Sequence, residues 1–210
     1  MAEDTFISLK ESAEAVIEIK KSIFIGNAKP VLNTEEAEAF ISEVRSKNAD
    51  ARHIAFAYIL RDGGLSKYSD DGEPQGTAGL PMLEILKKNG LCNTAVTVTR
   101  YFGGILLGAS GLCRAYGNAC AKAVENGGVC VYAPFLKLKI KANYQDFPKA
   151  EYEIRRMGAR MSPPEFANDV EVQINIEKKN AEALKSRLKD LSAARIIIET
   201  LGENYLPLNI

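Results

Sequence analysis

The spacing of apolar residues predicts alternating strands and helices along the first part of the chain. Residues 14–31 alternate between apolar and polar side chains as a strand does, and a turn near Lys20–Ser22 divides them into two strands. From Asn33 the apolar residues recur at helical spacing, and Glu36 follows Asn33 at the distance of a capping box. This helix is expected to end near Asn48. Further along, the pattern predicts a strand at His53–Leu60, a polar loop at Tyr68–Thr77, a helix at Leu80–Lys88, a strand at 94–102, a helix at Gly111–Asn126 and a short strand at 129–134.

The second part of the chain has a different and more regular order of elements. Pro134 marks the expected domain boundary, so the predicted domains are residues 1–134 and 135–210. Asp146 and Asn180 are predicted to cap two helices. The order of elements is βαββαβ, that of a ferredoxin-like domain, in which two helices cover one face of an antiparallel sheet and leave the other face open. Strands are predicted at Leu136–Tyr144, Arg160–Phe166, Asp169–Glu177 and Arg195–Leu201.

Composition and charge are those of an ordinary folded protein. The 210 residues are 46% hydrophobic and 26% charged, so a sizeable core is available. The 27 basic and 27 acidic residues cancel, and any contact with RNA therefore has to come from a local patch. Four cysteines without a CxxC pair, with one histidine, favour free thiols over a zinc cluster. The acidic N-terminus is unlike a secretory signal, and no apolar run is long enough to span a membrane, so we expect a cytoplasmic protein with no membrane partner.

The polar loop contains three carboxylates, Asp70, Asp71 and Glu73. A group of this kind can hold a hard divalent cation such as Mg²⁺. Asp, Gly and Pro are also the residues that turns use, and the spacing matches no EF-hand. The pattern favours a turn or a binding loop, and no metal or cofactor is predicted.

A glycine-rich segment joins the strand at 94–102 to the helix at Gly111–Asn126. The backbone N–H groups of such a turn, together with the helix N-terminus, can approach an anion closely. The segment matches neither a Walker A loop nor the Gly-x-Gly-x-x-Gly pattern. Its glycines, which include Gly103 and Gly104, can equally serve a tight turn and close packing, and Gly117 is expected to mark a close approach of the helix. The spacing leaves anion binding and packing open.

Charged and aromatic side chains flank this turn. Arg100 and Arg114 can supply charge to a phosphate, and Tyr101 and Tyr116 can stack on bases. If the arginines and the glycine amides face a common pocket, that pocket can hold an anion.

Two weaker candidates complete the set. His53, next to Arg52 at the mouth of a predicted strand, can act as a base, but no nucleophile adjoins it in the sequence, and a structural role is favoured. Lys137, Lys139 and Lys141 alternate along a strand and so share one face. We expect this face to be solvated and paired with acidic residues, among them Glu171 and Glu177, more than to follow a phosphate backbone.

Three segments, taken in their order along the chain, together resemble the Impact/YigZ family. They are Arg52–Tyr58 (RHIAFAY), the loop Ser69–Gly79 followed by Pro81, and Val98–Gly108 with Gly111–Gly117. The resemblance covers about residues 15–130, and the second domain is similar to the C-terminal domain of bacterial members. This resemblance is far more specific than a match to any single glycine motif.

The resemblance implies a fold and a cellular process. It implies that the first domain is similar to domain 2 of ribosomal protein S5, a fold shared with domain IV of elongation factor G, and that the second is similar to the ferredoxin-like domain V of that factor. Eukaryotic relatives regulate translation by restraining a kinase that acts on an initiation factor. They have an extra N-terminal domain, which we expect to be lacking here, so that interaction is not carried over. Bacterial relatives are implied to bind nucleic acid or the ribosome.

The sequence therefore favours a binding protein over an enzyme. The first hypothesis is a regulator of translation that binds RNA, the ribosome or a translation-related protein through residues 69–77 and 100–117. The alternative is a metal-assisted hydrolase or phosphate-ester enzyme that uses Asp70, Asp71 and Glu73, with His53 as base. A third possibility is a module that binds only proteins.

Overall fold

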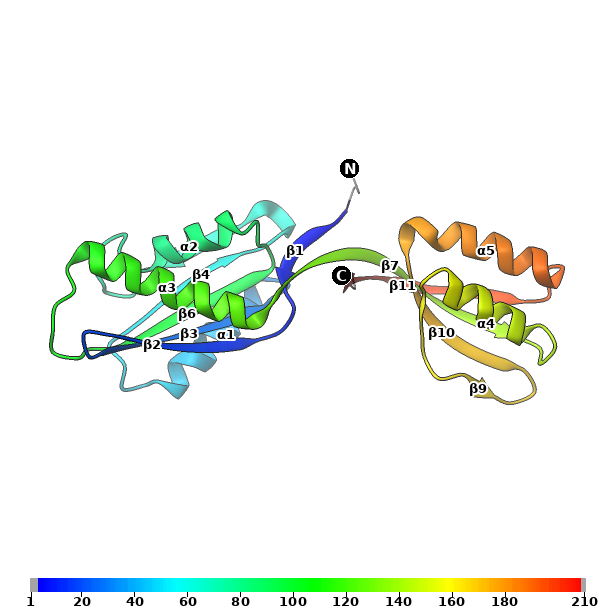
Figure 1. Ribbon diagram of the computed structural model, residues 1–210, viewed down its shortest axis with the longest axis horizontal. Coiled ribbons are helices and arrows are strands. Elements are labelled where there is room, and N and C mark those ends of the chain that lie inside the picture. The colour runs from blue at the N-terminus through cyan, green and yellow to red at the C-terminus, as the bar shows by residue number, and fades with distance from the viewer. Residues whose placement is uncertain (1–3, 209–210) are drawn as a thin grey trace. The chain divides into compact units, whose positions relative to one another are not determined.

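The computed structural model describes residues 4–208 and divides them into two compact units (Figure 1). Residues 6–131 form the first unit, and residues 132–208 together with residues 4–5 form the second. Each unit contains antiparallel sheet and helices and has its own core, which confirms the predicted α+β class.

The first unit is built on a five-stranded antiparallel sheet. Its strand order is β2-β3-β6-β4-β5, so the strand at the centre, β6, is paired on both sides. A short strand, β1 (Phe6–Leu9), precedes the sheet in the chain. The strands are β2 (Ala13–Ile19), β3 (Ser22–Pro30), β4 (His53–Ile59), β5 (Ser66–Ser69) and β6 (Thr94–Tyr101). The turn between β2 and β3 lies where the sequence predicts it, with Lys20 and Lys21 at positive φ.

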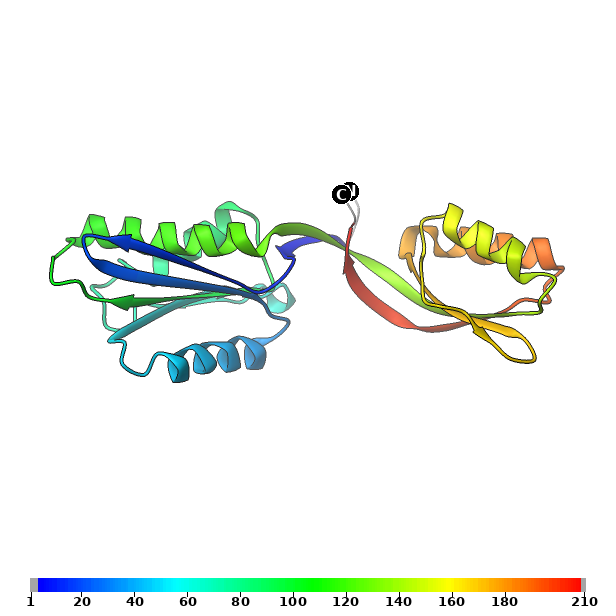
Figure 2. The same cartoon turned by 60° about the horizontal axis from the view of Figure 1, so that its bottom comes forward.

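Helices cover both faces of this sheet. Helix α1 (Thr34–Lys47) lies on one face, and α2 (Gly79–Lys88) and α3 (Ala109–Gly127) lie on the other, as Figure 2 shows for α1 and α3. Asn33 caps α1 as predicted, because its Oδ1 accepts a hydrogen bond of 2.8 Å from the N–H of Glu36. A single 3₁₀ turn, Asp62–Gly64, follows β4.

The close approach of α3 to the sheet occurs at Gly26 and not at Gly117. A Cβ atom added to Gly26 would lie 2.5 Å from the carbonyl oxygen of Ala119, so only glycine fits at that point of β3. Gly117 has no neighbouring atom within 4 Å of such a position. The expectation for Gly117 was wrong, because the glycine that permits the contact belongs to the strand.

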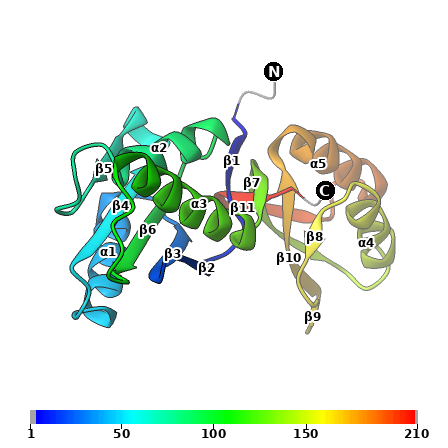
Figure 3. The ribbon, with the colours of Figure 1, turned by 60° about the vertical axis from the view of Figure 1, so that its left-hand side comes forward.

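In the second unit the strand predicted at Arg160–Phe166 is divided into two short strands, β8 and β9, and the order of elements is otherwise the predicted βαββαβ. The sheet order is β11-β7-β10-β8, with β9 also paired to β10 and β1 also paired to β7. The pairings of β10 with β7, β8 and β9 and of β11 with β7 are antiparallel, and α4 and α5 lie on the same face of the sheet (Figure 3). This is the predicted ferredoxin-like arrangement. Its elements are β7 (Val129–Ala142), α4 (Phe147–Arg156), β8 (Arg160–Met161), β9 (Glu165–Phe166), β10 (Val170–Glu177), α5 (Lys178–Ser192) and β11 (Ile197–Pro207).

The chain passes from one unit to the other inside a continuous strand. The predicted strands on either side of Pro134 are one strand, β7, and the units divide between Val131 and Tyr132. Pro134 pairs with Tyr205 of β11 and lies just before the pairing of β7 with β10, which begins at Phe135. The missing N–H of the proline therefore does not interrupt the ladder with β10.

Two predicted helix caps differ in the structure. Helix α5 begins at Lys178 directly after β10, so Asn180 lies inside the helix and does not cap it. Asp146 precedes α4, but its carboxylate makes no capping bond and instead receives two hydrogen bonds of 2.9 Å from Arg195. The hydrogen bond from Arg195 lowers the pKa of Asp146 below its usual value.

The lysine face of the second sheet is largely paired within the unit. Lys139 lies 2.6 Å and Lys141 lies 3.3 Å from the carboxylate of Glu171, and Lys141 also contacts Asp169 at 3.5 Å. Glu177 pairs with Lys179 and not with this face. The favoured interpretation, a solvated and paired face, agrees with these contacts at Glu171. Within residues 4–208 none of the helices combines the length and apolar character needed to cross a lipid bilayer.

Candidate functional site

The loop at 69–77 is ordered by its own carboxylates. The Oδ1 atom of Asp70 accepts hydrogen bonds from the N–H groups of Ala78 (3.0 Å) and Gly79 (2.8 Å), and its Oδ2 atom accepts one from Gly76 (2.8 Å). These amides lie at the start of α2, where unpaired N–H groups favour a negative charge. The role of Asp70 in the structure is therefore to close the loop onto the helix.

Asp71 joins this loop to the start of β4. Its Oδ1 atom lies 2.6 Å from the guanidinium of Arg45, and its Oδ2 atom accepts a hydrogen bond of 2.7 Å from the N–H of Ile54. The carbonyl oxygen of Asp71 lies 2.8 Å from Nδ1 of His53. The loop thereby fixes the imidazole ring from one side.

Glu73 belongs to a buried polar cluster with Arg100 and Tyr116. Its Oε1 atom lies 2.7 Å from Nη1 of Arg100 and accepts a hydrogen bond of 2.8 Å from the hydroxyl of Tyr116. Burial, and then the neighbouring carboxylate, raise the pKa of Tyr116 well above its usual value, so the hydroxyl remains a donor. The ring of Tyr116 packs edge-on against Phe24 with centroids 5.3 Å apart.

The guanidinium of Arg100 is enclosed between aromatic rings. It lies 5.7 Å from the ring centroid of Phe24 and 5.4 Å from that of Phe102. Arg100 is 8% exposed, and its buried Nε atom has no hydrogen-bond partner among the described residues. An unsatisfied buried N–H of a charged group is costly, so this atom lowers the net gain from burying Arg100.

These contacts separate the predicted site residues by role. Tyr116 is 0% exposed and bonded to Glu73, so it offers no face on which a base can stack, contrary to expectation. Each of the three loop carboxylates is held by donors of the protein itself. Within residues 4–208 no group of three or more His, Cys, Asp or Glu side chains is placed to hold a metal ion.

The glycine turn is held mainly by packing. The N–H of Gly103 donates to the hydroxyl of Ser22 at 3.1 Å, and a Cβ atom on Gly103 would lie 2.0 Å from the carbonyl carbon of Lys21. Gly104 has a φ of +86°. Arg114 is exposed on α3, where its Nε atom donates to the carbonyl oxygen of Ser110 at 3.3 Å. Packing therefore accounts for Gly103. The N–H of Gly103 is not available to an anion, because it donates to Ser22.

A pocket of about 590 Å³ nevertheless brings several predicted residues together. His53 and Arg100 are paired in the register of β4 and β6, so both project on the same face at the end of the sheet. Arg114 does not line this pocket. The pocket, called here the His53 pocket, is lined by Asp50, Arg52, His53, Arg100, Tyr101, Phe102 and Leu106.

The wall of the His53 pocket combines cations with aromatic and apolar side chains. Arg52 is exposed and forms no ion pair among the described residues. The hydroxyl of Tyr101 lies 3.0 Å from Oδ1 of Asn48 and 3.1 Å from Oδ1 of Asp50, which share its single proton. Burial, followed by the bond to Asp50, raises the pKa of Tyr101. Phe102 and Leu106, which follow β6, are 54% and 82% exposed.

Sequence reasoning missed most of the lining of this pocket. Asp50 belongs to no motif, and Phe102 and Leu106 lie within Val98–Gly108 but were given no role of their own. Arg52 was considered only as the neighbour of His53. The signal that could have found them is the pairing of β4 with β6, which places residues 52–53 beside residues 100–102. That register cannot be read from periodicity in either strand alone.

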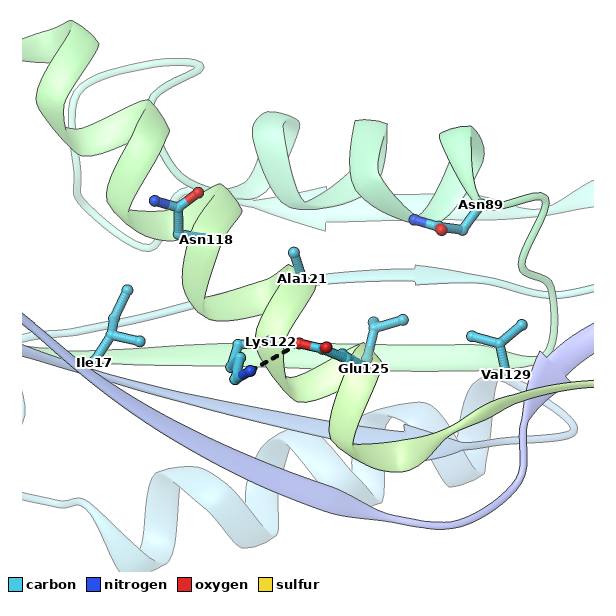
Figure 4. A pocket seen from close by; sticks show the side chains of 8 residues that line it. Ile17, Asn89, Asn118, Ala121, Lys122, Glu125 and Val129 are labelled. Carbon is cyan, nitrogen blue, oxygen red and sulfur yellow. Dashed lines mark hydrogen bonds and ion pairs between the residues drawn. The ribbon is translucent and has the colours of Figure 1, made fainter.

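A second groove, of about 700 Å³, runs along α3 and offers less chemistry (Figure 4). Its lining includes Asn118, Ala121 and Lys122 of α3 and Asn89 after α2. Lys122 is already paired with Glu125 at 2.8 Å, as the dashed line in Figure 4 shows. No buried charge or unsatisfied buried polar atom among the described residues faces this groove.

The fold and the His53 pocket together define a two-domain α+β protein with a cationic, aromatic-walled pocket in its first domain. The model of the Impact N-terminal domain matches residues 20–124, and the model of a domain of unknown function, DUF1949, matches residues 140–195. The chain belongs to the IMPACT family.

Relatives of similar length support this assignment. The chain is 35% identical to the IMPACT family member YvyE of Bacillus subtilis over 96% of its own length and 94% of that protein. It is 30% identical to the IMPACT family member YigZ of Escherichia coli, over 90% and 94% of the two chains. A crystal structure of a hypothetical protein is similar with a TM-score of 0.62 and 28% identity, covering 95% of this chain and 98% of that one.

Proposed function

We propose that this protein regulates translation by binding RNA through the His53 pocket. The part of the proposal that concerns translation rests on the IMPACT family, which is associated with the regulation of translation. The observation that carries the proposal is the pocket itself, where Arg52 is exposed without an ion pair next to the buried guanidinium of Arg100 and the exposed ring of Phe102.

This combination suits a single-stranded nucleic acid. Proteins bind single strands with cationic side chains that follow the phosphates and aromatic rings on which bases stack. Arg52 is the side chain available for a phosphate, and Phe102 offers the exposed ring that Tyr116 cannot. Since the chain as a whole carries no net charge, a local site of this kind is required for RNA binding.

The contacts of the acidic loop do not support the metal-assisted hydrolase. Asp70 serves three backbone amides, Asp71 serves Arg45 and Ile54, and Glu73 is buried against Arg100. A cation placed there would have to displace donors that already occupy these carboxylates. The contacts therefore favour the binding function.

The test is the affinity for a short single-stranded RNA, measured by fluorescence anisotropy over a range of salt concentrations. We expect affinity to fall with salt, and Arg52→Ala to weaken binding and reduce the slope of log K against log salt by about 0.7, the value for one phosphate contact on a single strand. Arg114→Ala is the matched control, because Arg114 is an exposed arginine outside the pocket, and it should leave the slope unchanged.

Two results would contradict the proposal. One is an RNA affinity that does not respond to salt, and the other is equal loss on Arg52→Ala and Arg114→Ala. Co-sedimentation with ribosomes that Arg52→Ala abolishes would support the link to translation. Capture of a partner that survives nuclease and persists in Arg52→Ala would favour a protein-binding module instead.

A further inference from the structure

We infer that the His53 pocket recognises the ribose-phosphate unit of RNA and distinguishes it from deoxyribose through a hydrogen bond between the 2′-hydroxyl and Nε2 of His53. This inference rests on the proposed function and assigns the chemistry of the same site. It follows from how the imidazole is held and from the donors on the facing wall.

The contact with Asp71 sets the tautomer of His53. Nδ1 lies 2.8 Å from the carbonyl oxygen of Asp71, and a carbonyl oxygen accepts hydrogen bonds but cannot donate them. Nδ1 therefore carries the proton, and in the neutral ring Nε2 is a bare acceptor. Asp71 is itself fixed by Arg45 and by the N–H of Ile54, so the carbonyl oxygen is firmly placed.

The orientation of the ring leaves Nε2 to the pocket. A Cβ atom added to Gly72 would lie 3.3 Å from Nδ1 and 3.4 Å from Cε1 of His53, so these two ring atoms lie against the loop. His53 lines the pocket, and its Nε2 atom is not among the buried side-chain atoms that lack a hydrogen-bond partner, so Nε2 is the ring nitrogen that a ligand can reach. No hydrogen bond to Nε2 is formed within residues 4–208. The imidazole thus offers an acceptor, which a phosphate oxygen cannot satisfy but a hydroxyl group can.

The same pocket offers donors to an anion. Arg100 lines it, and Arg52 adds an exposed guanidinium. A ligand that satisfies both sets needs an anionic group and a hydroxyl close together. In RNA the 2′-hydroxyl is adjacent to the 3′-phosphate, and this hydroxyl is the group by which proteins distinguish RNA from DNA.

The test compares three ligands of one sequence, a single-stranded RNA, the corresponding DNA and the 2′-O-methyl RNA, at pH 8, where imidazole is ordinarily neutral. We expect the RNA to bind roughly 3- to 10-fold more tightly than the other two, as one hydrogen bond predicts. His53→Ala should remove this preference. Arg52→Ala should weaken all three ligands and retain it.

The outcomes separate this inference from the proposed function. Equal, salt-dependent binding of RNA, DNA and 2′-O-methyl RNA would overturn the inference and leave RNA binding standing, whereas no binding of any ligand would overturn both. The modified ligands need no variant, so the result does not depend on whether His53→Ala folds.

A free ribonucleoside 3′-monophosphate distinguishes a single unit from a longer chain. Competition with the RNA by this nucleotide, but not by its 2′-deoxy form, would support recognition of one ribose-phosphate unit. Equal competition by the two forms would count against the role of His53.

Discussion

At the scale of single residues, the buried pair of Glu73 and Arg100 is the contact on which the pocket depends. Their side chains are 3% and 9% exposed, and the loop that holds His53 is joined through Glu73 to the end of β6. A buried ion pair is weak evidence of net stabilisation, but removing one partner leaves a charge without compensation. The pair therefore matters most when it is broken.

We predict that Glu73→Gln lowers the free energy of unfolding of the first unit by roughly 3–5 kcal/mol, because the buried guanidinium of Arg100 loses its counter-ion. Tyr116→Phe is the control and should cost about 1 kcal/mol, since it removes one hydrogen bond and keeps the ring packed on Phe24. Native-state hydrogen exchange of the β3 and β6 amides measures both values. If the two variants lose the same free energy of unfolding, losing the counter-ion costs no more than losing one hydrogen bond.

At the scale of elements, the glycine turn after β6 positions the exposed side chains of the pocket. Gly103 lies against the turn between β2 and β3, where any side chain would meet the backbone of Lys21 and Ser22. Gly104 has open space around it and differs from an ordinary residue only by its positive φ. Substituting Gly103 therefore tests the effect of packing, and substituting Gly104 tests the effect of backbone strain.

We predict that Gly103→Ala displaces the turn and weakens RNA binding by on the order of tenfold, because Phe102 can no longer keep its place beside Arg100. Gly104→Ala should cost about 1–2 kcal/mol of stability through strain at positive φ, with little change in affinity. Anisotropy titrations and thermal unfolding of both variants decide the point. A larger loss of affinity in Gly104→Ala would mean that flexibility, and not packing, sets the site.

Local signals were sufficient for most of the elements. Asn33 caps α1 as its spacing with Glu36 indicated, and β2, β3, β4, α2 and β6 begin or end within a residue or two of expectation. The errors occur where a residue that is distant in the sequence determines the local structure. Pro134 is tolerated because it lies outside the ladder with β10, and the carboxylate of Asp146 binds Arg195, which lies far away in the sequence.

The site was less predictable than the fold for the same reason. His53, Asp71, Glu73 and Arg100 were selected from the sequence, but the partners of their side chains lie 17 to 43 positions away along the chain. The residue types indicated that the segment contains charged side chains and rings able to stack. They could not show that Tyr116 is buried while Phe102 is exposed. Strand register and helix orientation supply that distinction.

At the scale of the whole molecule, the two units have separate cores. The buried clusters of the first unit draw only on residues between Leu9 and Val124, and that of the second only on residues between Leu138 and Ile196. Every residue that lines the His53 pocket belongs to the first unit. A core without shared residues is the condition under which a domain can unfold by itself.

We predict that Leu138→Ala, at a position 0% exposed in β7, lowers the stability of the second unit by about 2–5 kcal/mol and leaves RNA affinity unchanged. Hydrogen exchange should quicken in peptides from 135–207 and not in those from β3 and β6. Val98→Ala, at a buried position of β6, is the matched change and should show the reverse pattern, with RNA binding weakened. If Leu138→Ala quickens exchange in both units alike, they unfold as one body, and the stability of the second unit then contributes to the stability of the pocket.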